Sequence, residues 1–312
     1  MSLLPTPDLG PVADPEAALE RALDGLVASY QSPDPLNNLT THTLPNRRAL
    51  VEAFVHLQHV LFLGFWTTRA VSPATLREEL AEHLVQAREL LCAQVARAAA
   101  WADRAKGQQE RRCDVWCQET VASLLQALPE IRELLIEDVH ATYAGDPAAE
   151  SIEEVMYCYP GIHALTAHRV AHVLHDLQVP LLPRILTEHA HGRTGIDLHP
   201  GASIGRRFMI DHGTGVVVGA TAVIGDDVRL YQGVTLGAHS IDPSETRQRG
   251  GQRKRHPTLE DGVTVYAGAT ILGGDTVVGA RSVVGGNVWL TRSVPPDSRI
   301  VYRPPPLDTA DP

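Results

Sequence analysis

The sequence predicts an α+β protein in which an N-terminal α-helical domain is followed by a left-handed parallel β-helix. After residue 196, aliphatic residues recur every six positions, a period that neither an α-helix nor a plain strand has and that is typical of a hexapeptide-repeat solenoid. Before residue 190, apolar residues recur at three and four positions, as on one face of a helix. The aliphatic positions of the repeat are Ile204, Ile210, Val218, Ile224, Leu230, Leu259, Val265, Leu272, Val278, Val284 and Leu290.

The helical part is divided by proline and capping signals. Ser72-Pro73 has the chemistry of a helix start, Leu128-Pro129 is expected to break a helix, and Pro180 separates the last two helices. The expected helices span residues 17–30, 46–69, 72–106, 111–140 with that break, 161–177 and 181–191.

In the repeat, each hexad is expected to form one short strand and a turn, and three hexads form one triangular coil with the aliphatic residue inside. The phase slips after residue 237, returns at Leu259, and shifts by one before Leu272. The expected organisation is a flexible tail (1–14), the helical domain (15–192), the β-helix (193–296) with a protruding loop (238–256), and a C-terminal tail (297–312).

Composition excludes several classes of function. The formal net charge of −10 argues against nucleic acid or an anionic membrane as a partner. The chain has no recognisable signal peptide and no apolar run long enough to span a membrane, so a cytoplasmic location is expected. The four cysteines precede the repeat and are expected to be ordinary thiols; Cys113 and Cys117 are one helical turn apart, but no second pair completes a metal site.

Five motifs carry a resemblance to a known family. They are Gly195-Ile-Asp-Leu-His-Pro-Gly-Ala-Ser-Ile-Gly205, Ile210-Asp-His-Gly-Thr-Gly-Val-Val-Val-Gly219, Gly233-Val-Thr-Leu-Gly237, Arg255-His-Pro257 and the helix Gly161-Ile-His-Ala-Leu-Thr-Ala-His-Arg169. From about residue 146 to 296 the chain resembles serine O-acetyltransferase, in a branch with a longer loop. The resemblance implies transfer of an acetyl group from acetyl-CoA to the hydroxyl of L-serine, giving O-acetylserine and CoA in cysteine biosynthesis.

The residues fit this chemistry in their own right. An alcohol that attacks a thioester must lose a proton, and a neutral imidazole suits that task. We expect His212 to be the base, because two extra residues between Ile210 and Val218 disturb the hexad phase there and push side chains out of the wall. Asp197 lies fifteen residues earlier, close to one coil of eighteen, where its carboxylate could hold the other imidazole nitrogen.

A zwitterionic acceptor needs a cation and an anion. The planar guanidinium of Arg255 suits a carboxylate, and Asp211 can take the ammonium group. The resemblance adds Asp146 as a second substrate carboxylate and His256 as a second active-site histidine. It also implies that the pantetheine arm of acetyl-CoA lies along a solenoid edge against small residues, here Gly237, Ala238, Ala267, Gly285 and Gly286. No metal is expected, and the repeat has no cysteine that could carry an acetyl group.

The resemblance further implies a homotrimer or a dimer of trimers with sites between subunits. Relatives that dock cysteine synthase end in isoleucine, and this sequence ends in Pro312, so that complex is not expected. Three alternatives remain. A metalloenzyme of the carbonic-anhydrase type would bind zinc through His199, His212 and His239. A non-catalytic scaffold would tolerate loss of His212 and Asp197. An O-acetyltransferase could instead act on another amino alcohol or a sugar.

Overall fold

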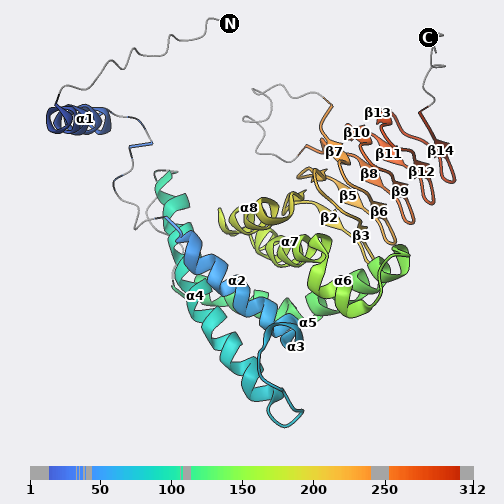
Figure 1. The fold of residues 1–312 in the computed structure, drawn as a ribbon, viewed down its shortest axis with the longest axis horizontal. Helices are drawn as coiled ribbons and strands as arrows, with labels where there is room; N and C mark the ends of the chain where they lie inside the picture. Colours follow the sequence, from blue (N-terminus) through green and yellow to red (C-terminus); the bar gives the residue numbers. More distant parts are fainter. Residues whose placement is uncertain are drawn as a thin grey trace, which may run out of the picture. The chain divides into compact units, whose positions relative to one another are not determined.

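Figure 1 shows the computed structural model of the protein. It describes residues 14–32, 34, 36–37, 39, 44–105, 107, 114–239 and 253–302. The chain divides into two compact units, residues 1–44 and 45–312. In the first unit, α1 (Pro15–Tyr30) begins at Asp14, whose carboxylate accepts hydrogen bonds from the backbone N–H groups of Glu16 and Ala17. None of its residues is buried.

The second unit contains the other helices and the β-helix. Aliphatic side chains of α2, α4, α5 and α7 form the core of the helical part, and this core continues into the interior of the β-helix. The helices are α2 (Arg47–Leu61), α3 (Leu63–Trp66), α4 (Leu76–Ala105), α5 (Asp114–Gly145), α6 (Ile152–Cys158), α7 (Pro160–Asp176) and α8 (Leu182–Thr194).

Two helix predictions were wrong in detail. Pro129 does not break its helix, since α5 runs through it to Gly145. Proline removes one backbone hydrogen bond, but Leu124, Leu128 and Ile131 bury the face of the helix on both sides of it. The segment expected as one helix over 46–69 is divided at Phe62, whose backbone leaves the helical region.

The described strands form three parallel sheets, here named A, B and C (Figure 1). Successive strands of the chain belong to different sheets, as expected for a triangular coil. Sheet A contains β1 (Asp197–Leu198), β4 (Val217–Val218), β7 (Thr235–Gly237), β10 (Thr270–Leu272) and β13 (Trp289–Leu290). Sheet B contains β2 (Ser203–Ile204), β5 (Val223–Ile224), β8 (Thr258–Leu259) and β11 (Val277–Val278). Sheet C contains β3 (Met209–Ile210), β6 (Arg229–Leu230), β9 (Thr264–Val265), β12 (Val283–Val284) and β14 (Arg299–Ile300).

The hexad aliphatics stack in register along each sheet, which confirms the predicted left-handed β-helix. One assignment was wrong by a residue. In β10, Ile271 pairs with Leu236 and Leu290, whereas Leu272 pairs with Gly237. The inward position therefore belongs to Ile271, because the extra residue lies after the strand, at the corner that contains Gly273, and not before it.

The strand ladder also extends beyond its predicted end. We expected a tail from residue 297, but β14 pairs with β12, and the backbone N–H of Gly285 donates to Ile300 O at 2.7 Å. Through this pairing, β14 supplies hydrogen-bond partners to backbone groups of the last coil that would otherwise be unpaired at the end of the sheet. Most of the expected loop 238–256 and the last ten residues lie outside the described residues.

A buried ion pair joins the helices to the first coil. Arg169 on α7 binds Asp138 on α5 through two nitrogens, at 2.7 and 2.9 Å, and both side chains are almost completely buried. Arg169 also donates to Gly205 O, and Asp138 accepts from the backbone N–H of Phe208. The helical part is thereby fixed against the coil that carries the predicted base.

Within the described residues, no helix combines the length and apolar character needed to cross a membrane. Cys92, Cys117 and Cys158 are free thiols. Cys113 lies outside the described residues.

Candidate active site

The candidate residues lie at two edges of the triangular solenoid. The C–A edge comprises the corners that join a strand of sheet C to the next strand of sheet A, and it holds His212 between β3 and β4. The A–B edge comprises the corners that join sheet A to sheet B, and it holds Arg255 and His256 between β7 and β8. The chain therefore does not bring the predicted base and the predicted guanidinium together on one edge.

The C–A edge presents His212 to solvent. Two residues more than a hexad separate Ile210 from Val218, as predicted, and His212 has a left-handed backbone with φ of 55°. Its side chain is 70% exposed, and Nδ1 lies 3.7 Å from Asp211 Oδ1. Gly213, next in the chain, also has positive φ, and a side chain there would overlap Ile196 of the coil below. The local backbone thus projects the imidazole outward.

Asp146 approaches this edge from the end of α5. Its carboxylate accepts hydrogen bonds from the Tyr159 hydroxyl at 2.6 Å and from the backbone N–H of Ala148 at 2.8 Å. These two hydrogen bonds, with a smaller effect of nearby His212, lower the pKa of Asp146. The same hydrogen bond raises the pKa of Tyr159 to about 12. Asp146, Asp211 and His212 therefore form one cluster with a fixed negative carboxylate beside the imidazole.

Asp197 does not pair with His212 in this structure, contrary to the expected contact. Its carboxylate binds Arg184 of α8 at 3.1 Å. Arg184 also pairs with Glu188, one helical turn further on. The backbone connects Asp197 to the corner that carries His212: its N–H donates to Val216 O at 2.9 Å.

The A–B edge is organised by Thr221, which the sequence reasoning missed. Its hydroxyl oxygen accepts hydrogen bonds from the backbone N–H groups of Arg255 and His256, at 2.8 and 3.1 Å. The backbone N–H of Thr221 donates to Nδ1 of His256 at 3.1 Å. The hexad spacing does not distinguish Thr221 from its neighbours, so no signal in the sequence marked it.

His256 is buried, unlike His212. Burial, Arg255 and Lys254 lower its pKa to about 4. The ring is therefore neutral near pH 7, and since Nδ1 accepts from Thr221, Nε2 carries the proton. The absence of a side chain at Gly219 makes room for this ring. The Nε of Arg255 is also buried, and it has no hydrogen-bond partner among the described residues.

The predicted cofactor residues divide between the same two edges. Gly237 and Ala238 lie at the A–B edge, where β7 ends beside Leu272 of β10. Ala267, Gly285 and Gly286 lie at successive corners of the C–A edge, and a β-carbon on Gly286 would stand 3.1 Å from Ala267 O.

The zinc alternative is not supported. Among the described residues, the cluster of potential metal ligands within 4.8 Å of one another is Glu188, His191 and Asp197. His199, His212 and His239 do not form such a cluster, and Arg184 occupies the carboxylates of Glu188 and Asp197.

A helical domain joined to a hexapeptide-repeat β-helix, with an exposed histidine at one edge and a neutral histidine at another, defines a hexapeptide-repeat acyltransferase. The N-terminal region of serine acetyltransferases matches residues 68–167. A serine acetyltransferase of Synechococcus elongatus is 46% identical over 287 residues, which are 89% of this chain and 90% of the relative. The chain therefore belongs to the serine acetyltransferase family.

Other relatives agree over shorter or more divergent regions. A serine acetyltransferase of Mycobacterium tuberculosis is 48% identical over 130 residues, 42% of this chain and 53% of the relative. Among solved structures, serine acetyltransferase isoform 3 of Entamoeba histolytica in complex with cysteine is 34% identical, with a TM-score of 0.68, and covers 95% of this chain and 96% of that one. Serine acetyltransferase 1 of the same organism is 30% identical, with a TM-score of 0.69, over 92% and 99%.

Proposed function

We propose that this chain transfers the acetyl group of acetyl-CoA to the hydroxyl of L-serine, with His212 as the general base. The observation that carries the proposal is the cluster of Asp146, Asp211 and His212, which offers an exposed imidazole beside two carboxylates. Such a cluster suits an acceptor that presents an ammonium group next to its reacting hydroxyl, whereas a neutral sugar has no positive charge to balance the two carboxylates.

In the proposed reaction, His212 removes the proton of the serine hydroxyl as the oxygen attacks the thioester carbonyl. The Nε2–H group of His256 donates to the oxyanion that forms. The intermediate collapses, the C–S bond breaks, and the departing sulfur takes the proton from the imidazolium of His212. Asp146 and Asp211 hold the ammonium group, and Arg255 holds the carboxylate. We propose that the pantetheine arm lies along Gly237, Ala238, Ala267, Gly285 and Gly286.

Asp197 is proposed to support the imidazole of His212. Its backbone hydrogen-bonds to the corner that carries His212, and the imidazole is exposed enough to turn towards it. In this proposal the carboxylate of Asp197 leaves Arg184 and accepts a hydrogen bond from the imidazole of His212. That hydrogen bond fixes the tautomer and stabilises the imidazolium.

We further propose that a functional site needs two copies of the chain. The C–A edge carries the base and the ammonium partners, whereas the A–B edge carries the guanidinium and the neutral histidine. In a closed ring of identical subunits, one edge of each copy faces the other edge of its neighbour. This arrangement would unite the two half-sites in a homotrimer, alone or as a dimer of trimers.

The mechanism is tested by replacing His212 with alanine. Its side chain is 70% exposed and not part of the core, so the variant should fold normally while kcat falls by about 10²–10⁴-fold. Release of CoA thiol from acetyl-CoA, measured with L-serine and with a panel of amino alcohols and sugars, gives both rate and acceptor class. Full turnover in this variant would exclude His212 as the base, and a sugar preferred over serine would refute the proposed acceptor.

A further inference from the structure

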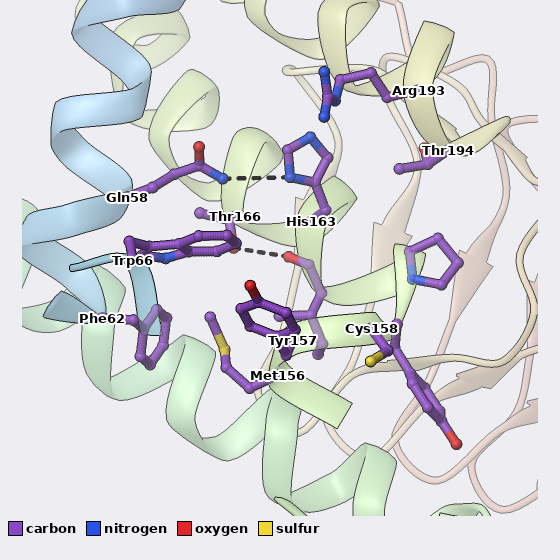
Figure 2. Close-up of a pocket in the computed structure, with 13 residues that line it drawn as sticks. Gln58, Phe62, Trp66, Met156, Tyr157, Cys158, His163, Thr166, Arg193 and Thr194 are labelled. Atoms are coloured by element: carbon purple, nitrogen blue, oxygen red, sulfur yellow. Dashed lines mark hydrogen bonds between the residues drawn. The ribbon is translucent and has the colours of Figure 1, made fainter. Parts of the chain in front are cut away.

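A cavity in the helical part is not used by the proposed reaction. It has a volume of about 420 Å³, within the range of small-molecule sites, and lies among α2, α3, α6, α7 and the end of α8 (Figure 2). Aromatic side chains dominate one end, where the rings of Trp66 and Tyr157 stack with centroids 5.9 Å apart beside Phe62 and Met156. Arg193 and His163 lie at the other end (Figure 2).

Hydrogen-bond donors in this cavity lack acceptors. The indole nitrogen of Trp66 and Nε2 of His163 are buried and have no partner among the described residues. The Gln58 amide nitrogen lies 3.3 Å from Nδ1 of His163, and donation from that amide leaves the ring proton on Nε2. Burial, together with the charges of Arg193 and His189, lowers the pKa of His163 to about 4, so the ring is neutral at pH 7 and Nε2 is a donor.

The charge of the cavity is positive. The guanidinium of Arg193 is directed towards the His163 ring in Figure 2. Within the described residues Arg193 forms no salt bridge, and Glu188, on the same helix, pairs with Arg184 and His191 instead. Burial lowers the pKa of neighbouring His189, and the positive charges of Arg193 and Arg47 lower it further. None of the described residues that line the cavity is acidic.

Buried donors without acceptors are costly, and a ligand that supplies acceptors recovers that cost. At one end of the cavity, a guanidinium and an imidazole N–H can donate hydrogen bonds to a carboxylate or a phosphate. At the other end, the stacked rings can pack against a flat apolar group. We propose that this cavity is a binding site for a small anion that carries a flat ring, with the anionic group held by Arg193 and His163 and the ring against Trp66.

This site is distinct from the proposed acceptor cluster but adjoins it. Tyr159 lines the cavity and also donates to Asp146. The proposal concerns binding alone and does not depend on acetyl transfer, so its failure and that of the proposed function can be told apart.

Calorimetric titration of the full-length protein tests the proposal, with benzoate and phenyl phosphate as probes. Benzyl alcohol serves as the ring without charge, and acetate as the charge without a ring. We expect one benzoate or phenyl phosphate site per chain, and binding at least about tenfold weaker for either control compound, since each lacks one half of the match. Absence of binding by both probes up to about 10 mM would overturn the proposal.

Arg193→Gln locates the site. The side chain is exposed enough for the variant to fold, and losing a charge-assisted hydrogen bond should weaken binding by about 10-fold or more. Arg97→Gln, an exposed arginine on α4 outside the cavity, is the matched control and should bind as the unaltered protein does. Equal affinity in the Arg193 and Arg97 variants would contradict the assignment.

A second measurement needs no variant. Cys158 lines the cavity and is exposed, whereas Cys92 lies on α4 outside it. Bound benzoate should slow alkylation of Cys158 by N-ethylmaleimide, followed by mass spectrometry, and leave the rate at Cys92 unchanged. Benzoate that binds without protecting Cys158 would show that it occupies another place.

Discussion

At the scale of single residues, the two histidines of the candidate site differ because of their surroundings. His212 stands on a left-handed corner with its side chain largely in solvent, where an imidazole can exchange protons with a substrate. His256 is buried against Gly219, and this burial, with the positive charges of Arg255 and Lys254, keeps it neutral, while Thr221 donates to its Nδ1. One residue type therefore supplies a proposed base at one edge and a proposed hydrogen-bond donor at the other.

A substitution that removes only the charge of Asp197 tests its role. Asp197→Asn should lower kcat by about 10²-fold or more if the carboxylate fixes the imidazole of His212, because the amide favours the wrong tautomer. Asp211→Asn, next to the base, should instead mainly raise the KM for serine. Steady-state kinetics in both substrates separates the two. Unchanged kcat in Asp197→Asn would mean that the carboxylate serves only to hold Arg184.

At the scale of elements, helix and solenoid are joined by polar groups that would be costly to bury singly. Asp138 and Arg169 satisfy each other and also bind backbone groups of Gly205 and Phe208. Gly161, at the start of α7, lies against Ile210 O, and a β-carbon there would be only 2.7 Å away. These contacts place Asp146 and Tyr159 beside the corner that carries His212.

Arg169→Met should destabilise the protein by about 3–5 kcal/mol, because it leaves the carboxylate of Asp138 buried and unpaired. Arg281→Met is the matched control, since the Arg281–Asp297 pair is 65% and 63% exposed, solvent screens it, and its loss should change stability little. Urea unfolding followed by circular dichroism compares the two variants. Equal losses of stability would show that the buried pair has no special role.

At the scale of the whole molecule, the proposed site residues of one chain lie at two different edges of the β-helix, so the proposed site needs two copies of the chain. Mixing two impaired variants tests whether neighbours complete each other. In trimers formed at random from equal amounts of His212→Ala and Arg255→Ala chains, about a quarter of the interfaces would combine two intact half-sites, so about a quarter of the original kcat/KM for serine should return. The mixture is co-expressed or refolded together, and each variant alone is the control. No recovery in mixed oligomers would show that each site is built within one chain.

The sequence by itself determined the solenoid, because a six-residue aliphatic period is a local property that survives in any context. It also placed two extra residues at the corner of His212, since a phase shift can be counted. It misjudged Pro129, where burial of the helix face outweighs one lost hydrogen bond, and it assigned the inward position to Leu272 because a count cannot tell on which side of a strand an extra residue lies.

Only the tertiary structure decided which groups meet. It paired Asp197 with Arg184, brought Thr221 under Arg255 and His256, and separated the candidate residues onto two edges. It also assembled the donors of Trp66, His163 and Arg193, which come from three separate helical segments, around one cavity. Contacts of this kind join residues that are far apart in the sequence and depend on how coils stack and helices pack. The spacing of residues along the chain therefore does not predict them.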